Sequence, residues 1–139
     1  MANVATNLET GTKTDSIVES TSGAGVSCNS LIKLNNLMTI PRSDVVIASG
    51  GITATSSYIR MDTEGAAATD TLVTINGGVD GAIVILQSTS ATRTITIQSG
   101  GGNLRTAASL TLSNGNDRIA FIYSANENVW TELFRADHA

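Results

Sequence analysis

The sequence contains few of the residues on which catalysis and metal binding usually depend. Its 139 residues include one histidine, one cysteine, one tryptophan and one proline, and aromatic residues make up only 4%. His138 is the penultimate residue, and Cys28 has no second cysteine with which to form an internal disulfide. We therefore expect no enzymatic activity, no metal site and no cofactor. The unpaired cysteine also suits a chain that folds in a reducing cytoplasm.

Charged residues and long apolar runs are scarce as well. Charged residues make up 14% of the chain and the net charge is −4. A weakly acidic surface does not attract phosphate backbones, so nucleic acid is not an expected partner. The longest apolar run, residues 82–86, is far shorter than the roughly 20 residues that span a bilayer. The first residues lack the apolar stretch of a secretory signal, and we expect no contact with a membrane.

Threonine and glycine, in contrast, are abundant, with nineteen and thirteen copies. Threonine suits the pleated surface of a strand, whereas glycine weakens a helix and permits tight turns. The length suits a single domain with a modest core. This composition predicts an all-β protein with short strands and glycine turns.

Alternating apolar residues place several strands in the C-terminal half. Ile95 and Ile97 alternate with threonines in 93–98, which predicts a strand with one buried face, and the run 81–87 is apolar on both faces. The short polar segment between these two runs predicts a hairpin. Further strands are expected at 44–48, 52–61, 71–75, 104–112, 118–123 and 129–134. Their close spacing predicts an antiparallel β-sandwich or jelly-roll-like domain.

The N-terminal third has a different character, because polar residues there separate isolated apolar ones. Such a segment does not bury enough surface to fold alone. We interpret residues 1–42 as an extended N-terminal arm that contacts other subunits, and residues 43–139 as the β domain, with Pro41 near the boundary. The residues predicted to bind a partner are Ile17, Val18, Leu31, Ile32, Leu34, Leu37, Met38 and Ile40.

Three groups of residues allow a second interpretation. Asp62, Glu64 and Asp70 share one loop, but their spacing is not that of a calcium-binding loop, and solvated loop charges are the simpler interpretation. The glycines at 100–102 are interpreted as a loop or bulge, because no phosphate-binding pattern follows them. Trp130 and Tyr123 either form a platform on which a sugar stacks or fill the end of the core, which we favour.

Two stretches of the sequence resemble parts of tailed-phage virion proteins. Residues 14–34 begin with Thr-Asp-Ser-Ile, continue through a polar run to Gly-Val, and end with Leu-Ile-Lys-Leu. Residues 70–135 resemble a β module of virion proteins, including Thr-Leu-Val-Thr-Ile-Asn-Gly-Gly at 71–78 and Val-Trp-Thr-Glu at 129–132. The resemblance covers roughly three fifths of the chain.

The resemblance implies a virion structural protein that assembles as a homotrimer. A short chain of this kind fits a capsid decoration, or cement, protein that binds the major capsid protein on the outer surface of the head. The first alternative is a short head or tail fibre or another appendage of the virion. The second is a carbohydrate-binding or carbohydrate-degrading module, which requires the two aromatic residues to converge with two of the carboxylates Asp117, Glu127 and Glu132.

Overall fold

The computed structural model describes residues 35–138, and these residues form an all-β domain. Eleven strands and one short 3₁₀ helix lie in this range, which contains no α-helix. The predicted fold class, all-β, is thereby confirmed. Contacts divide the chain into residues 1–38 and residues 39–139, and the second unit is described here. Most of the predicted arm lies outside the described residues, so its extended conformation and its boundary after residue 42 stay predictions.

The strands are short and follow one another closely along the chain. They are β1 (Arg42–Val46), β2 (Gly51–Thr53), β3 (Tyr58–Asp62), β4 (Thr69–Leu72), β5 (Thr74–Asn76), β6 (Ile83–Ser88), β7 (Thr94–Ile97), β8 (Leu104–Arg105), β9 (Leu110–Leu112), β10 (Arg118–Ser124) and β11 (Val129–Ala136), and the 3₁₀ helix η1 covers Glu64–Ala66.

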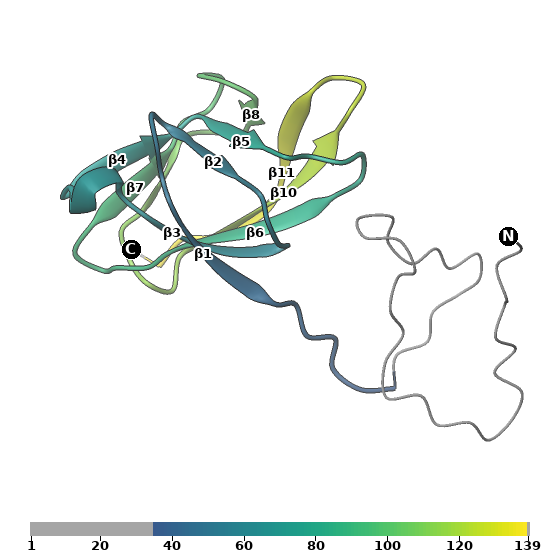
Figure 1. Cartoon of the computed structure of the whole chain (residues 1–139), viewed down its shortest axis with the longest axis horizontal. Helices are drawn as coiled ribbons and strands as arrows, with labels where there is room; N and C mark the ends of the chain where they lie inside the picture. Colours follow the sequence, from purple (N-terminus) through teal and green to yellow (C-terminus); the bar gives the residue numbers. More distant parts are fainter. Residues whose placement is uncertain (1–34, 139) are drawn as a thin grey trace, which may run out of the picture. The chain divides into compact units, whose positions relative to one another are not determined.

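The strands form three sheets that are arranged as a solenoid-like stack. The largest has the order β1-β3-β6-β10-β11-β8, the second has the order β4-β7-β9, and the third pairs β2 with β5. From β1 to β10 consecutive strands belong to different sheets, so the chain passes from sheet to sheet and returns beside an earlier strand. The resulting pairs β1–β3, β3–β6, β2–β5 and β4–β7 are parallel. Figure 1 shows these sheets on different sides of a common interior.

The chain changes sheet at short corners where the backbone departs from the strand conformation. Between β1 and β2 the corner contains Ser49 and Gly50, both with positive φ. Between β6 and β7 the hydroxyl of Ser88 donates to the carbonyl of Ser90, and this hydrogen bond lies within the corner that joins the two sheets. A single residue, Val73, separates β4 from β5. These corners convert long β-forming runs into pairs of strands in two sheets.

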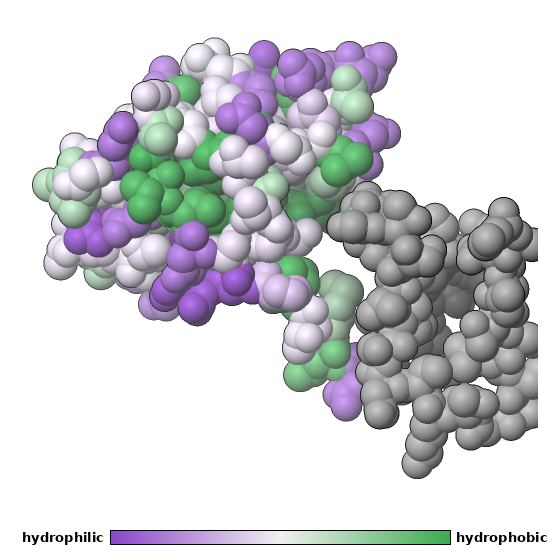
Figure 2. Space-filling model, viewed as in Figure 1, coloured by the Kyte–Doolittle hydropathy of each residue, from purple (hydrophilic) through white to green (hydrophobic). Residues whose placement is uncertain are grey.

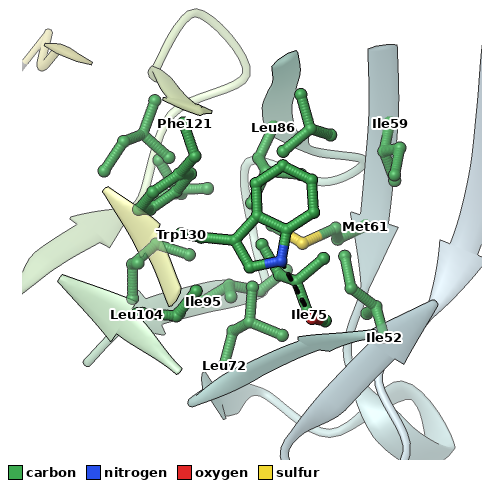
Figure 3. Close-up of a cluster of buried hydrophobic side chains, with 14 of the residues drawn as sticks. Ile52, Ile59, Met61, Leu72, Ile75, Leu86, Ile95, Leu104, Phe121 and Trp130 are labelled. Atoms are coloured by element: carbon green, nitrogen blue, oxygen red, sulfur yellow. Dashed lines mark hydrogen bonds between the residues drawn. The ribbon is translucent and has the colours of Figure 1, made fainter. Parts of the chain in front are cut away.

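All three sheets contribute side chains to one hydrophobic core, shown in Figure 3. The indole of Trp130 lies among them, 1% exposed, and its Nε1 donates to the carbonyl of Ile75 at 2.9 Å. Ile59 and Leu86 enter the core from the largest sheet, and Leu72 enters from the second. The single tryptophan therefore fills the interior in a chain with few aromatic residues, as favoured from the sequence.

A glycine and an asparagine extend the stack where the β2–β5 pair has no third strand. An added Cβ on Gly102 would lie 2.3 Å from the carbonyl oxygen of Val73, so the backbone at 102 lies directly against that of the previous coil. The next side chain, Asn103, accepts a hydrogen bond from the N–H of Ile75 at 2.9 Å and donates to its carbonyl at 2.8 Å. Asn103 thus provides hydrogen-bond partners for both backbone groups of Ile75, on the side of β5 that faces away from β2.

The last part of the chain closes the domain with antiparallel strands. β10 pairs with β6 and with β11, and β7 pairs with β9. A register shift between Ala120 and Phe121 allows Leu133 and Phe134, consecutive residues of β11, both to be exposed. The predicted strands at 118–123 and 129–134 and the turn between them are confirmed.

The predicted antiparallel sandwich or jelly roll differs from this arrangement. Five of the eight strand pairings are parallel, including β8 with β11. The predicted hairpin between 81–87 and 93–98 is wrong, because β6 and β7 lie in different sheets. The predicted strand 52–61 is two strands, β2 and β3, which also lie in different sheets. Alternation reports which face of a strand is buried, but it does not report which strand pairs with it.

Candidate interaction surface at the open sheet edge

The first strand of the largest sheet has one open side. β1 pairs with β3, and no strand of residues 35–138 pairs with its other side. Ile47 donates its N–H to the carbonyl of Asp62 beside β3. Because backbone groups of successive strand residues point to opposite sides, those of Asp44 and Val46 point away from β3. β1 therefore presents an unpaired backbone edge.

The opposite edge of the same sheet is covered. β8 pairs with β11 at Trp130 and Thr131. Beyond that point the loop after β8 bonds to side chains of β11: the N–H of Ala107 donates to Glu132 Oε2 at 3.0 Å, and Arg135 donates to the carbonyl of Ala108 at 2.9 Å. A shallow depression of about 450 Å³ lies here, lined by Arg105, Thr106, Ala107, Thr131, Glu132 and Leu133. The two edges thus differ, because the second is tied down by its own loop.

The exposed side chains of β1 carry both charges and an apolar group. Arg60 of β3 binds Asp44 through two hydrogen bonds, Nε to Oδ1 at 3.0 Å and a terminal nitrogen to Oδ2 at 2.6 Å, and this pairing lowers the pKa of Asp44. Arg42 Nε lies 3.2 Å from Asp44 Oδ1. Val46 is 60% exposed and Ile40, two residues before the strand, is 36% exposed. Figure 2 shows an apolar area where β1 leads into β2, with polar residues around it.

The structure places three of the eight residues predicted to bind a partner. Leu37 and Met38, in the first unit, are 89% and 69% exposed, and Ile40 in the second unit is partly exposed. Ile17, Val18, Leu31, Ile32 and Leu34 lie outside the described residues. Their role in partner binding stays a prediction.

Other exposed apolar side chains were not anticipated. They are Val46, Val79, Ile83, Leu133 and Phe134. Ile83 lies in the run 81–87, which has apolar residues on both faces, and that pattern predicted complete burial. The outer face of β6 is instead uncovered, so Ile83 is exposed while Val84 is buried. The sequence does not show which face of β6 is covered, so it does not distinguish the exposed Ile83 from the buried Val84.

The aromatic pair does not form an open platform. The rings of Trp130 and Tyr123 lie 5.0 Å apart at an angle of 50°, and the Tyr123 hydroxyl donates to Asn128 Oδ1 at 2.7 Å. Trp130 also lines the base of a small depression of about 190 Å³, together with residues such as Ser57 and Val79. With 1% of its surface exposed, the indole has no free face on which a sugar could stack.

Two of the three carboxylates weighed for glycoside chemistry are held by internal hydrogen bonds. Asp117 is fully buried and accepts from the backbone N–H groups of Ser113, Asn114 and His138 at 2.8–2.9 Å. Burial alone would raise the pKa of Asp117, but these donors outweigh it and hold the pKa below its ordinary value. Glu132 accepts two hydrogen bonds from Arg135, which lower the pKa of Glu132.

The acidic loop at 62–70 is organised by similar contacts. Asp62 binds Arg93 through two hydrogen bonds at 2.7 and 2.6 Å. Glu64 Oε2 accepts from the N–H of Ser49, and Asp70 Oδ2 accepts from the N–H of Glu64. Within residues 35–138 no three side chains of histidine, cysteine, aspartate or glutamate gather in a way that could hold a metal ion. These carboxylates therefore tie neighbouring coils together.

Comparison with known proteins adds one likeness in fold. No family model matches the chain, and no curated protein matches it. A solved structure described as "Structure of a chaperone-substrate complex" is similar over 71% of this chain, with a TM-score of 0.52 and 17% sequence identity. The match covers 18% of that structure's chain, so this sequence corresponds to a small part of it. At this identity the likeness concerns the fold alone. No helix of the described residues is long and apolar enough to cross a membrane.

Proposed function

We propose that the protein is a non-enzymatic decoration, or cement, protein of a tailed-phage capsid. In this proposal it folds in the host cytoplasm, binds the major capsid protein on the outer surface of the head as a homotrimer, and stabilises the shell. The sequence resemblance is the origin of the proposal. Its finer fold expectation, a sandwich or jelly roll, is replaced here by a solenoid-like stack that presents loops and an open edge.

The observation that carries the proposal is the exposure of Leu37 and Met38. Both belong to the segment predicted to contact a partner, and 89% and 69% of their surfaces lie open in the single chain. Large apolar side chains exposed next to one another are typical of a surface that another protein covers. Simultaneous engagement by three copies would multiply contacts that are weak one at a time.

The internal use of the carboxylates supports a structural rather than an enzymatic role. A general acid or nucleophile needs an accessible carboxyl group near the substrate. Asp117 is instead buried beneath three backbone donors, and Glu132 is held by Arg135 and Ala107. Groups held in this way are suited to fixing the fold.

A short fibre or appendage protein of the same virion is a second candidate, and one observation favours it. The coils stack in parallel and the first coil ends in an open edge at β1. Each repeat of such a stack contacts its neighbours along one direction, which is the growth direction of an elongated assembly. Head and fibre locations therefore require a direct test.

Antibody labelling of intact virions by electron microscopy, with a count of copies per particle, tests the proposal. Label spread over the head in tens to hundreds of copies is the expected result. Label at the tail or at one vertex in a few copies would overturn the decoration role and favour the fibre. Absence of the protein from purified virions would reject both.

A further inference from the structure

We propose that β1 pairs antiparallel with β1 of a second copy, related by a two-fold axis that passes midway between the two Ser43 residues. This inference does not depend on the virion role, because it follows from the open edge and from the order of residues along it. It adds a two-fold contact at β1 to any three-fold contact made by the residues that precede Ile40.

The sequence around β1 complements itself when it is reversed about Ser43. In that register Arg42 of one copy lies opposite Asp44 of the other, and Asp44 lies opposite Arg42. Ile40 lies opposite Val46 at both ends. Opposite charges and apolar groups in directly opposed positions stabilise an antiparallel pair. A two-fold interface requires this kind of self-complementarity, since each residue meets the partner's version of its counterpart.

The backbone geometry is compatible with this register. The N–H and C=O groups of Asp44 and Val46 point to the open side, and by alternation so do those of Arg42. Those of Ile40 join this set when pairing extends the strand by two residues. Pairing about Ser43 places residues of this set opposite one another, and these opposed pairs exchange two N–H···O bonds each, whereas the Ser43 pair between them is non-hydrogen-bonded. Pro41, which has no N–H, falls on the alternate set that points away from the new partner.

Competing registers are less favourable. Pairing centred on Asp44 would place the two Asp44 carboxylates opposite each other and Arg42 opposite Val46. Like charges in opposed positions destabilise a strand pair. Charged residues on an edge strand normally discourage pairing. Here the opposite charges of Arg42 and Asp44 disfavour most partners and registers, and they favour the register centred on Ser43.

The far edge of the sheet does not offer the same contact. Ala107 and Ala108 bond to the side chains of Glu132 and Arg135 and cover β11 beyond β8. A head-to-tail pairing of β1 with β11 beyond β8 would have to displace this loop. The open edge of β1 therefore pairs with β1 of a second copy, and this contact joins two copies only.

Charge exchange in the full-length protein tests the register. Arg42→Asp places an aspartate opposite Asp44 of the other copy, twice in each dimer, and Asp44→Arg likewise places an arginine opposite Arg42 twice. We expect each variant alone to weaken self-association roughly tenfold or more, measured by sedimentation velocity over a range of concentrations. An equimolar mixture of the two variants restores opposite charges at both positions, so we expect it to form a one-to-one dimer. Tryptophan fluorescence during thermal unfolding verifies that each variant is folded.

A cysteine cross-link provides an independent readout. Ser43 meets its own counterpart on the axis in a non-hydrogen-bonded pair, where Cα atoms lie about 4.5 Å apart, close enough for a disulfide. In a Cys28→Ser background, we expect Ser43→Cys to give a covalent dimer on mild oxidation and the exposed control Ser109→Cys to give none. A self-association that neither charge variant weakens, a mixture that does not dimerise, or equal cross-linking at 43 and 109 would overturn the proposal.

Discussion

The side-chain amide of Asn103 pairs with both backbone groups of Ile75. Its Oδ1 accepts from the N–H at 2.9 Å and its Nδ2 donates to the carbonyl at 2.8 Å, so one side chain imitates the contact that another strand would make. The same carbonyl also accepts from Trp130 Nε1. The end of the β2–β5 pair, the loop after β7 and the centre of the core are therefore joined at one peptide group.

Asn103→Asp should destabilise the domain because it removes the amide donor. An aspartate still accepts from the Ile75 N–H, but its second oxygen faces the Ile75 carbonyl. Loss of a partner at a partly buried polar group costs roughly 1–3 kcal/mol, and we expect the free energy of unfolding in urea to fall by that amount. Asn126→Asp, in the exposed turn before β11, is the matched control and should change it little. Equal effects at the two positions would contradict this role of Asn103.

Gly102→Ala should be more disruptive than the same change at an uncrowded glycine of the domain. The added Cβ would lie 2.3 Å from the carbonyl oxygen of Val73 and 2.6 Å from Thr74 Oγ1, so the two coils would have to separate. Such overpacking typically costs about 1–3 kcal/mol. A Cβ on Gly115 meets nothing within 4 Å, and Gly115→Ala should leave the thermal midpoint near that of the wild type. A similar loss in both variants would show that the coils are not packed this tightly at Gly102.

The sequence predicts the strands of this domain better than it predicts their partners. Ile95 and Ile97 are buried and Thr94 and Thr96 are only partly buried, as alternation indicates. The partner of β7, however, is β4, whose residues pair with it at a separation of 25 positions, Thr69 with Thr94. Nothing local encodes such a separation. The short segment between β6 and β7 consequently predicted a hairpin where the structure has a corner between sheets.

The open edge shows the same limit on the candidate site. The run 44–48 predicts a strand, but whether that strand lies inside a sheet or at its edge depends on residues far along the chain. Val46 is therefore exposed without any local signal. The glycines at 100–102, interpreted as a loop, lie in a loop whose close contact with Val73 becomes visible only in the folded chain.

Acid should weaken the domain through its internally bonded carboxylates. The pKa values of Asp62, Asp117 and Glu132 are lowered, chiefly by Arg93 at Asp62 and by Arg135 at Glu132, and by backbone donors that outweigh burial at Asp117. A carboxyl group whose pKa is lower in the folded state adds stability above its unfolded pKa and loses it as the pH falls through the folded value. We expect urea midpoints to be level from pH 7 to about pH 5 and to fall below about pH 4.

Asp117→Asn tests the share of one carboxylate in this acid response. At pH 7 the variant should be less stable by roughly 1–3 kcal/mol, because an amide nitrogen replaces an oxygen beneath backbone donors. The gap between wild type and variant should narrow as the pH falls through the lowered pKa of Asp117, because the wild-type carboxylate then becomes protonated. Asp137→Asn, at an exposed position nearby, is the control and should follow the wild type at every pH. A constant gap would mean that the charge of Asp117 does not contribute.

Replacement of both Leu37 and Met38 by serine separates binding from folding. Because the two side chains are 89% and 69% exposed, their loss should change the free energy of unfolding by less than about 0.5 kcal/mol. If the segment contacts the capsid, as proposed, the affinity measured by co-sedimentation with phage heads that lack the protein should fall at least tenfold. A loss of this size is expected because a partner would cover two large apolar side chains. Val79→Ser removes an apolar side chain of similar exposure, 71%, outside the predicted contact segment and should bind as the wild type does. Undiminished binding of the double variant would exclude this segment from the contact and direct the search to residues 39–138.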